Sequence, residues 1–521
     1  MVPRTFPSSL HPFTGRRQLV ALFLGDVTGL QRWVDYIPVN FGSGTSLVEG
    51  SYENNGFIAI QEISSGIGLQ AFLDYIPVFF DAGSTDTWHV SAVGFIPYGV
   101  SGVTSPPSLE LSFTRSQTLD PRITFTRSTT ATFTGSDGLI QTAAIDAPRF
   151  DYNPTTLAPL GLLIEEQRVN LLTYSEQFDN AAWTKTRSSI TANTVVAPDG
   201  ALTGDTFADD TASGTHLIRT ATITSAPTTS AVTATIYAKQ NDQSNLFILY
   251  VTGDSDSSAY GRVASTFNLS TGVVAGSNAV NGATFTSSSI TAVGNGWYRC
   301  SVTGTVGSTA SPTGVRFVAG FATAANASVA STYAGTGQSI YIWGAQLEAG
   351  AFATSYIPTV ASQVTRSADI AVMTGTNFST WYNATEGTLF GQADWLGLSN
   401  NDYFFAINNG TTSNLIAIGV SGAPATRFIV IDGGVTQASV SGPTPVANVA
   451  FKIAGAYQAN SFAAATNGTL GTVDTSGTVP SVNQVSLTSS FGSANQFNGH
   501  IRQIVYYPRR LANAELQGIT A

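Results

Sequence analysis

Apolar and polar residues alternate with a period of two along the middle of the chain, from residue 167 to residue 358. Clear examples are the runs 230–237, 245–251, 297–302, 314–318 and 339–343, separated by glycine, asparagine, aspartate and serine. A period of two places successive side chains on opposite faces of a β-strand. The pattern therefore predicts a β-sandwich or jelly roll of antiparallel strands over 166–360.

A second set of alternating runs follows a short linker at 359–365. These runs are 387–395, 402–408, 414–420, 427–431, 448–457, 461–466, 484–490 and 498–508. They predict another all-β unit over 361–521. The residues LANAEL at 511–516 predict a final helical turn.

Residues 1–105 are richer in large apolar side chains and contain an internal repeat. GLQRWVDYIPV at 29–39 returns as GLQAFLDYIPV at 68–78, with eight of eleven positions identical. A duplicated strand unit of this size buries one face against its neighbour or another subunit. We therefore expect a β-rich attachment domain whose oligomer interface includes Trp33, Tyr36, Ile37, Phe72, Tyr75 and Ile76.

A Pro/Ser-rich break at 102–108 separates this domain from residues 106–165. An SDG turn signal at 136–138 lies there between Thr-rich alternating strands. We expect 106–165 to be a β connector packed beneath the central sandwich.

Two distant segments bracket the central alternation, 161–183 and 341–359. The stretch between them has the length that one sandwich needs. We expect them to be its opening and closing strands. The acidic residues Glu165, Glu166 and Glu176 of the first segment do not by themselves make an active site.

The charge pattern argues against several partners. The net charge is −10, and only 10% of the residues are charged. No segment is basic, and the lysines number only three, so we expect neither nucleic acid nor an anionic membrane as a partner. No run approaches the roughly 18 apolar residues of a membrane span, and no cleavage site follows the apolar run at 19–24, so no signal peptide is expected. The single cysteine, Cys300, excludes an intrachain disulfide, and we expect it to be buried on a strand.

The pattern of titratable residues does not predict catalysis. A glycoside hydrolase needs two carboxylates that face one sugar. No two acidic residues of the last unit have i, i+2 spacing on one predicted strand, and the four histidines of the chain are isolated from other metal ligands. We therefore expect that the chain is not an enzyme and holds no transition metal.

Calcium is the one cofactor that the sequence leaves open, because sandwich modules bind it with hard oxygen ligands near strand ends. The candidate ligands are Glu176, Glu348, Asp254 and Asp256. Solvated acidic turns are the alternative interpretation.

Sugar binding requires exposed aromatic rings, whose flat apolar faces suit pyranose rings. The candidates, in predicted loops or at strand edges, are Trp381, Tyr382, Trp395, Tyr403 and Tyr260. A place in the core is the alternative for each of them. Trp183, Trp297 and Trp343 lie in alternating strands and are expected in the core.

Eight short motifs follow one another between residues 120 and 366. They are FTRS at 125–128, RFDY at 149–152, GLLIEE at 161–166, NLLTYSE at 170–176, AW at 182–183, APDG at 197–200, WGAQLE at 343–348 and SYIPT at 355–359. Together they resemble the modules of tailed-bacteriophage tail-fibre and head-spike proteins. The resemblance implies a carbohydrate-binding-like jelly roll in an oligomeric appendage of the virion.

The last 155 residues carry EGTLF at 386–390, FNGHIRQIVYY at 497–507, and Leu511 with Glu515. These residues resemble a laminin-G or concanavalin-A-like sandwich. With this resemblance, the chain is expected to be all-β, with tandem antiparallel β-sandwiches, a jelly roll and a concanavalin-A-like module, after the N-terminal domain. The predicted domains are 1–105, 106–165, 166–360 and 361–521.

We thus expect a structural protein of the bacteriophage virion, a fibre or spike subunit that attaches by residues 1–105. Its expected partners are other head or tail proteins, further copies of itself, by family analogy as a trimer, and a host cell-surface glycan. Two alternatives remain: a glycan depolymerase tailspike, and a purely structural decoration or spike protein without a receptor.

Overall fold

The computed structural model describes residues 106–242, 246–307, 311–397, 402–422, 425–488 and 496–521. The predicted attachment domain lies outside the described residues, with its repeat and with Trp33, Tyr36, Ile37, Phe72, Tyr75 and Ile76. The described residues belong to one compact unit. Its described part is almost entirely antiparallel β-structure, which confirms the predicted all-β class.

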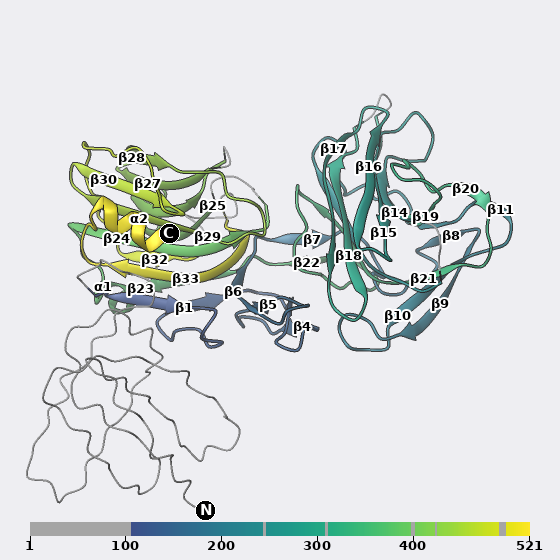
Figure 1. Ribbon diagram of the computed structural model, residues 1–521, viewed down its shortest axis with the longest axis horizontal. Coiled ribbons are helices and arrows are strands. Elements are labelled where there is room, and N and C mark those ends of the chain that lie inside the picture. The colour runs from purple at the N-terminus through teal and green to yellow at the C-terminus, as the bar shows by residue number, and fades with distance from the viewer. Residues whose placement is uncertain (1–105, 243–245, 308–310, 398–401, 423–424, 489–495) are drawn as a thin grey trace, which may run out of the picture. The chain divides into compact units, whose positions relative to one another are not determined.

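Two six-stranded sheets form the central sandwich, drawn mainly in teal in Figure 1. Its strands are β8 (Thr184–Thr186), β9 (Ser188–Val195), β10 (Gly204–Asp209), β12 (Leu217–Arg219), β13 (Val232–Gln240), β14 (Leu246–Thr252), β15 (Arg262–Asn268), β16 (Val273–Val280), β17 (Thr284–Ala292), β18 (Trp297–Thr305), β19 (Arg316–Ala322) and β21 (Ser339–Ala349). One sheet has the order β17-β18-β13-β21-β10-β9 and the other β16-β15-β14-β19-β12-β8.

The core of the central sandwich follows from the alternation in its strands. Alternate apolar residues of β13, β14, β18 and β19 are buried between the two sheets. Cys300 is fully buried, and Trp183, Trp297 and Trp343 are each 1% exposed. The predicted core positions are therefore confirmed.

Two larger sheets form the second sandwich, which we call the C-terminal sandwich. Its strands are β1 (Leu109–Ser112), β2 (Thr124–Thr126), β5 (Phe150–Tyr152), β6 (Pro159–Ile164), β23 (Ile370–Thr374), β24 (Glu386–Trp395), β25 (Asp402–Asn408), β26 (Leu415–Val420), β27 (Thr426–Asp432), β28 (Val435–Ser441), β29 (Phe451–Gln458), β30 (Ser461–Thr466), β31 (Thr469–Leu470), β32 (Gln484–Ser486) and β33 (Gly499–Tyr507). One sheet has the order β31-β30-β29-β24-β33-β6-β5, with β1 also on β33, and the other has the order β2-β23-β32-β25-β26-β27-β28.

The remaining elements are three strand pairs and two helices. The pairs are β3 (Ala131–Thr134) with β4 (Ile140–Ala143), β7 (Arg168–Asn170) with β22 (Val364–Arg366), and β11 (Ser213–Thr215) with β20 (Thr332–Ala334). The helices are α1 (Thr376–Ser379) and α2 (Asn513–Thr520), the second at the predicted helical turn. Neither described helix has the length and apolar character of a membrane span.

The predicted connector over 106–165 is corrected by the strand pairing. β1 pairs with β33, β2 pairs with β23, and β6 pairs with β33, all antiparallel. The segment thus contributes strands to both sheets of the C-terminal sandwich, instead of packing as a separate layer beneath the central one. Only the hairpin β3–β4 stands apart, at the predicted turn, where Gly138 has a φ of 80°.

The expected opening strand of the central sandwich is corrected as well. Residues 159–164 are β6, in the C-terminal sandwich. Gly161 has a φ of 114°, and a Cβ there would lie 2.3 Å from the carbonyl oxygen of Ile501 on β33, so this close pairing requires glycine. The chain leaves the C-terminal sandwich after β6 and returns at β23, having passed out through β7 and back through its partner β22. The central sandwich is therefore an insertion within the C-terminal one.

A buried network of ion pairs lies where the chain crosses between the two sandwiches. Arg149 donates to Glu165 Oε2 at 2.6 Å and to Asp369 Oδ2 at 2.5 Å. Arg366 donates to the same Glu165 oxygen at 2.6 Å. Arg127 donates to the other oxygen of Asp369 at 3.1 Å. All five side chains are at most 1% exposed.

The network fixes the charge state of its members. Burial alone would raise the pKa of Glu165, but Arg366 and Arg149, with the hydroxyl and backbone N–H of Ser355, hold that pKa well below its usual value. Burial also opposes the charge of Arg149, and the Asp369 and Glu165 carboxylates outweigh it and raise the pKa of its guanidinium. We call these five residues the junction network.

Removal of one member of the junction network should strongly destabilise the fold. In the Arg149→Met variant, Glu165 and Asp369 stay buried with one charge partner fewer, and we expect a loss of about 3 to 5 kcal/mol in the free energy of unfolding. The control is Arg122→Met, which breaks the half-exposed pair with Asp120 and should cost at most about 1 kcal/mol. Urea denaturation followed by tryptophan fluorescence measures both. Equal losses would show that the network does not stabilise the junction.

Candidate functional site

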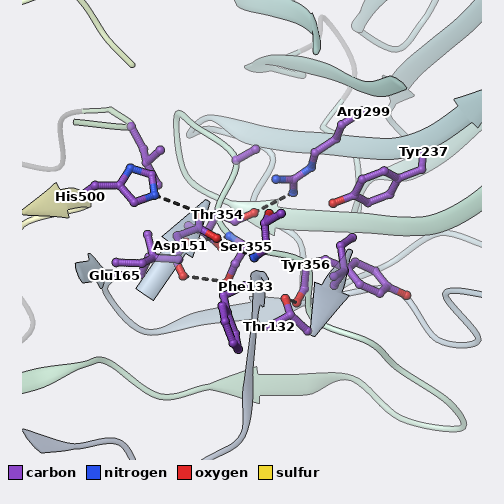
Figure 2. Close-up of a pocket in the computed structure, with 15 residues that line it drawn as sticks. Thr132, Phe133, Asp151, Glu165, Tyr237, Arg299, Thr354, Ser355, Tyr356 and His500 are labelled. Atoms are coloured by element: carbon purple, nitrogen blue, oxygen red, sulfur yellow. Dashed lines mark hydrogen bonds and ion pairs between the residues drawn. The ribbon is translucent and has the colours of Figure 1, made fainter. Parts of the chain in front are cut away.

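A cavity of about 130 Å³ lies beside the junction network (Figure 2). Its polar and aromatic lining comprises Thr132, Thr134, Asp151, Glu165, Tyr237, Arg299, Thr354, Ser355, Tyr356 and His500. These residues come from β3, β5, β13, β18 and β33, from the loop after β21 and, for Glu165, from the position directly after β6. Both sandwiches therefore contribute to its wall.

Tyr237 and Arg299 form one side of the cavity. They are direct cross-strand partners on β13 and β18, with the guanidinium carbon 5.7 Å from the ring centroid. Arg299 Nη2 donates to the carbonyl oxygen of Thr354 at 2.7 Å and to Thr235 Oγ1 at 3.3 Å. Figure 2 shows the guanidinium and the Tyr237 hydroxyl on the same side of the cavity, across from His500.

The Tyr237 hydroxyl is a polar group of the cavity wall that the described part of the fold leaves unused. The residue is 4% exposed, and the hydroxyl makes no hydrogen bond to any residue that the structure describes. Burial raises the pKa of this hydroxyl, and the nearby Arg299 opposes the shift only in part. It therefore stays protonated at neutral pH and can both donate and accept a hydrogen bond.

An irregularity in β21 shapes this side of the cavity. The pairing of β13 with β21 shifts register between Thr235 and Tyr237, which is the mark of a β-bulge. Gly344 has a φ of 60° there, and a Cβ on it would lie 2.9 Å from the Tyr237 ring. The rings of Trp343 and Tyr356 pack against Tyr237 at centroid distances of 5.2 and 6.0 Å. The tyrosine is thus held in place by aromatic neighbours.

Asp151 and His500 form the opposite side. Asp151 accepts a hydrogen bond from the backbone N–H of Thr134 at 2.5 Å and another from His500 Nε2 at 2.9 Å. The other ring nitrogen of His500 lies 2.7 Å from Asp394 Oδ1, and Arg502 donates to the second oxygen of Asp394 at 3.1 Å. Because both ring nitrogens face carboxylates, the imidazole is held as an imidazolium.

The floor of the cavity is tied to the junction network. Ser355 donates from its backbone N–H to Glu165 Oε1 at 2.6 Å and from its hydroxyl to Oε2 at 2.7 Å. Thr354 donates from its hydroxyl and its backbone N–H to the buried carboxylate of Glu348. The loop that carries both residues is therefore fixed by buried charges, and the cavity is preorganised.

The aromatic residues predicted to bind sugar lie elsewhere. Trp381, Trp395 and Tyr403 are only 4%, 7% and 4% exposed and belong to cores, while Tyr382 packs against the same core as Trp381 and Tyr260 is half-buried. None of the five lines the cavity. This burial corrects the expectation of exposed rings. Trp381 and Trp395 pack in a core to which strands from 106–165 and α1 also contribute, and Tyr403 packs in a separate cluster.

The predicted calcium ligands are also dispersed. Glu176 accepts a hydrogen bond from the Tyr356 hydroxyl at 2.9 Å, and Glu348 is bound to Thr354. Asp254 accepts from Thr313, and the backbone carbonyl of Asp256 accepts from Arg262. In the described ranges, no group of three or more His, Cys, Asp or Glu side chains could hold a metal ion.

Sequence reasoning missed Tyr237, Arg299, Asp151 and His500 as site residues. Asp151 belongs to the RFDY motif and Ser355 to the SYIPT motif, so the concentration of polar groups in these motifs was the available signal. Tyr237 and Arg299 gave no such signal, because only the strand register brings them together.

Comparison with protein-family models gives no match, and none of the curated proteins matches the chain. Solved structures do match over part of it. The CBM40 module of Ruminococcus gnavus IT-sialidase bound to α2,3-sialyllactose is 16% identical, with a TM-score of 0.25, over 28% of this chain and 88% of that one. The NanB sialidase from Streptococcus pneumoniae is 12% identical, with a TM-score of 0.24, over 28% and 26%. The leech intramolecular trans-sialidase is 18% identical, with a TM-score of 0.25, over 28% and 24%.

These matches include a carbohydrate-binding β-sandwich module and two enzymes. The sialidase and the trans-sialidase contradict the expectation that the chain is not an enzyme, and that expectation is corrected. Identities of 12 to 18% and TM-scores near 0.25 give the matches no weight as an argument for a reaction, a substrate or a site in this chain.

The ion pairs that His500 makes with Asp394 and Asp151 should make the stability of the fold depend on pH. Burial disfavours the imidazolium, but Asp394 and Asp151 outweigh it and raise the pKa of His500 from 6.5 to about 10. A group whose pKa is higher in the folded state stabilises the fold fully at pH values below its pKa in the unfolded state. This stabilisation is lost as the pH rises through the pKa of the folded state. The free energy of unfolding should therefore fall by on the order of 3 to 5 kcal/mol between pH 6.5 and 10.

Urea denaturation of the wild type and of His500→Gln across this range measures the effect. The variant should be less stable at pH 6.5 and should lack most of the decline, while the other groups titrate equally in both proteins. Parallel curves for the two proteins would contradict the assignment of a buried imidazolium.

Proposed function

We propose that this chain is a glycan-binding subunit of a bacteriophage fibre or spike, and that the cavity beside the junction network receives the sugar. The observation that carries the proposal is the set of groups around this cavity. The unused Tyr237 hydroxyl and the Arg299 guanidinium face Asp151 across it.

These groups suit a carbohydrate chemically. Sugar hydroxyls both donate and accept hydrogen bonds, and binding sites for them combine a few well-placed polar groups with aromatic surface. Arg299 offers donors, Asp151 offers acceptor lone pairs, and Tyr237 offers both. The buried ion pairs and the aromatic packing hold all three before a ligand arrives, which lowers the entropy cost of binding.

The size of the cavity limits what enters it. Its volume of about 130 Å³ is small beside the roughly 300 to 1,000 Å³ of a typical small-molecule pocket. One sugar unit or a substituent that projects from it fits such a space, whereas an oligosaccharide does not. We infer that the site recognises a chain end or a side branch of a surface glycan.

The proposed role in a fibre or spike is supported by where the motifs that resemble this family lie in the fold. Arg127, Arg149, Glu165, Glu348 and Ser355 come from five different motifs and meet at the junction network or the cavity. The motifs that resemble fibre and spike proteins thus build the junction network and contribute Asp151 and Ser355 to the proposed site, whereas Tyr237 and Arg299 lie outside them. The N-terminal repeat is proposed to attach the chain to the particle, and trimer formation is proposed by analogy with that family.

Glycan binding is tested with Tyr237→Phe, which removes only the unused hydroxyl. We expect an unchanged melting temperature and a roughly 2- to 10-fold weaker affinity for the glycan found by array screening, the effect of one lost hydrogen bond. The matched control is Tyr341→Phe, because that hydroxyl bonds Asn241 outside the cavity. Equal affinities for Tyr237→Phe and the wild type would argue against the cavity as the binding site.

The virion assignment has its own test. We expect the full chain to elute as a trimer in size-exclusion chromatography with light scattering, and mass spectrometry of purified phage particles to contain its peptides. A monomer that is absent from particles would refute the proposed fibre or spike role while leaving glycan binding open to separate measurement.

A further inference from the structure

Among the described residues, the Arg299 guanidinium makes no ion pair. Within the described residues its only hydrogen bonds run from Nη2, to the Thr354 carbonyl and the Thr235 hydroxyl, both of which are neutral. Its Nε is buried without a partner, and its Nη1 donates to none of the described groups. Its remaining contact is with the electron-rich face of Tyr237. A half-buried guanidinium in this state gains most from an anion that reaches it.

Most of the other charged groups around the cavity are paired with one another. Asp151 and Asp394 are matched by His500 and Arg502. The arginines of the junction network are matched by Glu165, Asp369 and the neighbouring Glu348. Glu176, which accepts from the Tyr356 hydroxyl, is a further carboxylate beside the cavity. Arg299 is thus the cationic group of the cavity wall that makes no ion pair with the described residues, in a protein whose net charge is −10.

We propose that the ligand of this cavity is an acidic sugar, whose carboxylate binds Arg299 and the Tyr237 hydroxyl while its ring hydroxyls lie toward Asp151. This inference rests on the proposed glycan-binding function and narrows it to one class of ligand. The planar guanidinium matches a planar carboxylate, and the Tyr237 hydroxyl adds a donor beside it. Asp151, neutralised by His500, repels the carboxylate little and still accepts hydrogen bonds from hydroxyl groups.

The hydrogen-bond donors of the cavity set this orientation, because the Arg299 guanidinium and the Tyr237 hydroxyl lie on the same side of it. The Asp151 side offers this group no hydrogen-bond donor, because the carboxylate oxygens of Asp151 only accept, from Thr134 and His500. The anion is thus directed to the Arg299 side alone.

The test compares acidic and neutral sugars that differ in one group. The probes are the methyl glycosides of glucuronic and galacturonic acid with those of glucose and galactose, and the methyl glycoside of N-acetylneuraminic acid with its methyl ester. Ligand-observed NMR titration with the full chain gives each affinity. We expect at least one acid to bind 10- to 100-fold tighter than its neutral partner, as a charged hydrogen-bonded pair provides. Glucose 6-sulfate shows whether a sulfate replaces the carboxylate.

Arg299→Gln should abolish the preference for the acid, and Arg299→Lys should restore part of it. Arg316→Gln is the matched control, since Arg316 lies on β19 and bonds Thr222 outside the cavity. Melting temperatures show that the variants are folded. A wild type that binds acid and neutral sugars equally, or an acid preference that survives Arg299→Gln, overturns this inference. Absence of binding to every sugar and to the glycan array instead overturns the proposed function.

Discussion

The junction network is the constraint on which the rest of the fold depends. It joins residues that are far apart in the sequence, since Arg149 contacts both Glu165 and Asp369, at the points where the chain leaves and rejoins the C-terminal sandwich. Charges without access to water must stay paired, so neither crossing can shift without exposing or orphaning a charge. The same carboxylate of Glu165 holds Ser355, and through this contact the network sets the floor of the cavity.

The strands of both sandwiches were predictable because their signal is local. The runs 402–408 and 461–466 coincide with β25 and β30, and the alternation at 297–302 marks the start of β18. Burial of one face of a sheet imposes the period of two on each strand separately, so no knowledge of its partners is needed. The positions of the core tryptophans followed from the same pattern.

The connectivity and the site were not predictable in this way, because both depend on pairing across long distances in the sequence. Nothing near Pro159–Ile164 distinguishes a strand that pairs with β33 from one that opens the central sandwich. Trp381 and Trp395 have loop and strand-edge neighbours in the sequence, yet they are buried by elements that lie elsewhere in the chain. Tyr237 and Arg299 meet only through the register of β13 and β18.

The insertion of one sandwich into another divides the cavity between two structural units. Tyr237 and Arg299 belong to the inserted sandwich, whereas Asp151 and His500 belong to the host sandwich. The insert begins and ends on the paired strands β7 and β22, so exchange of the whole insert for a homologous one would keep the host chain continuous. Such recombination would replace one half of the cavity and retain the other, which gives this architecture a route to new ligand specificity without a new fold.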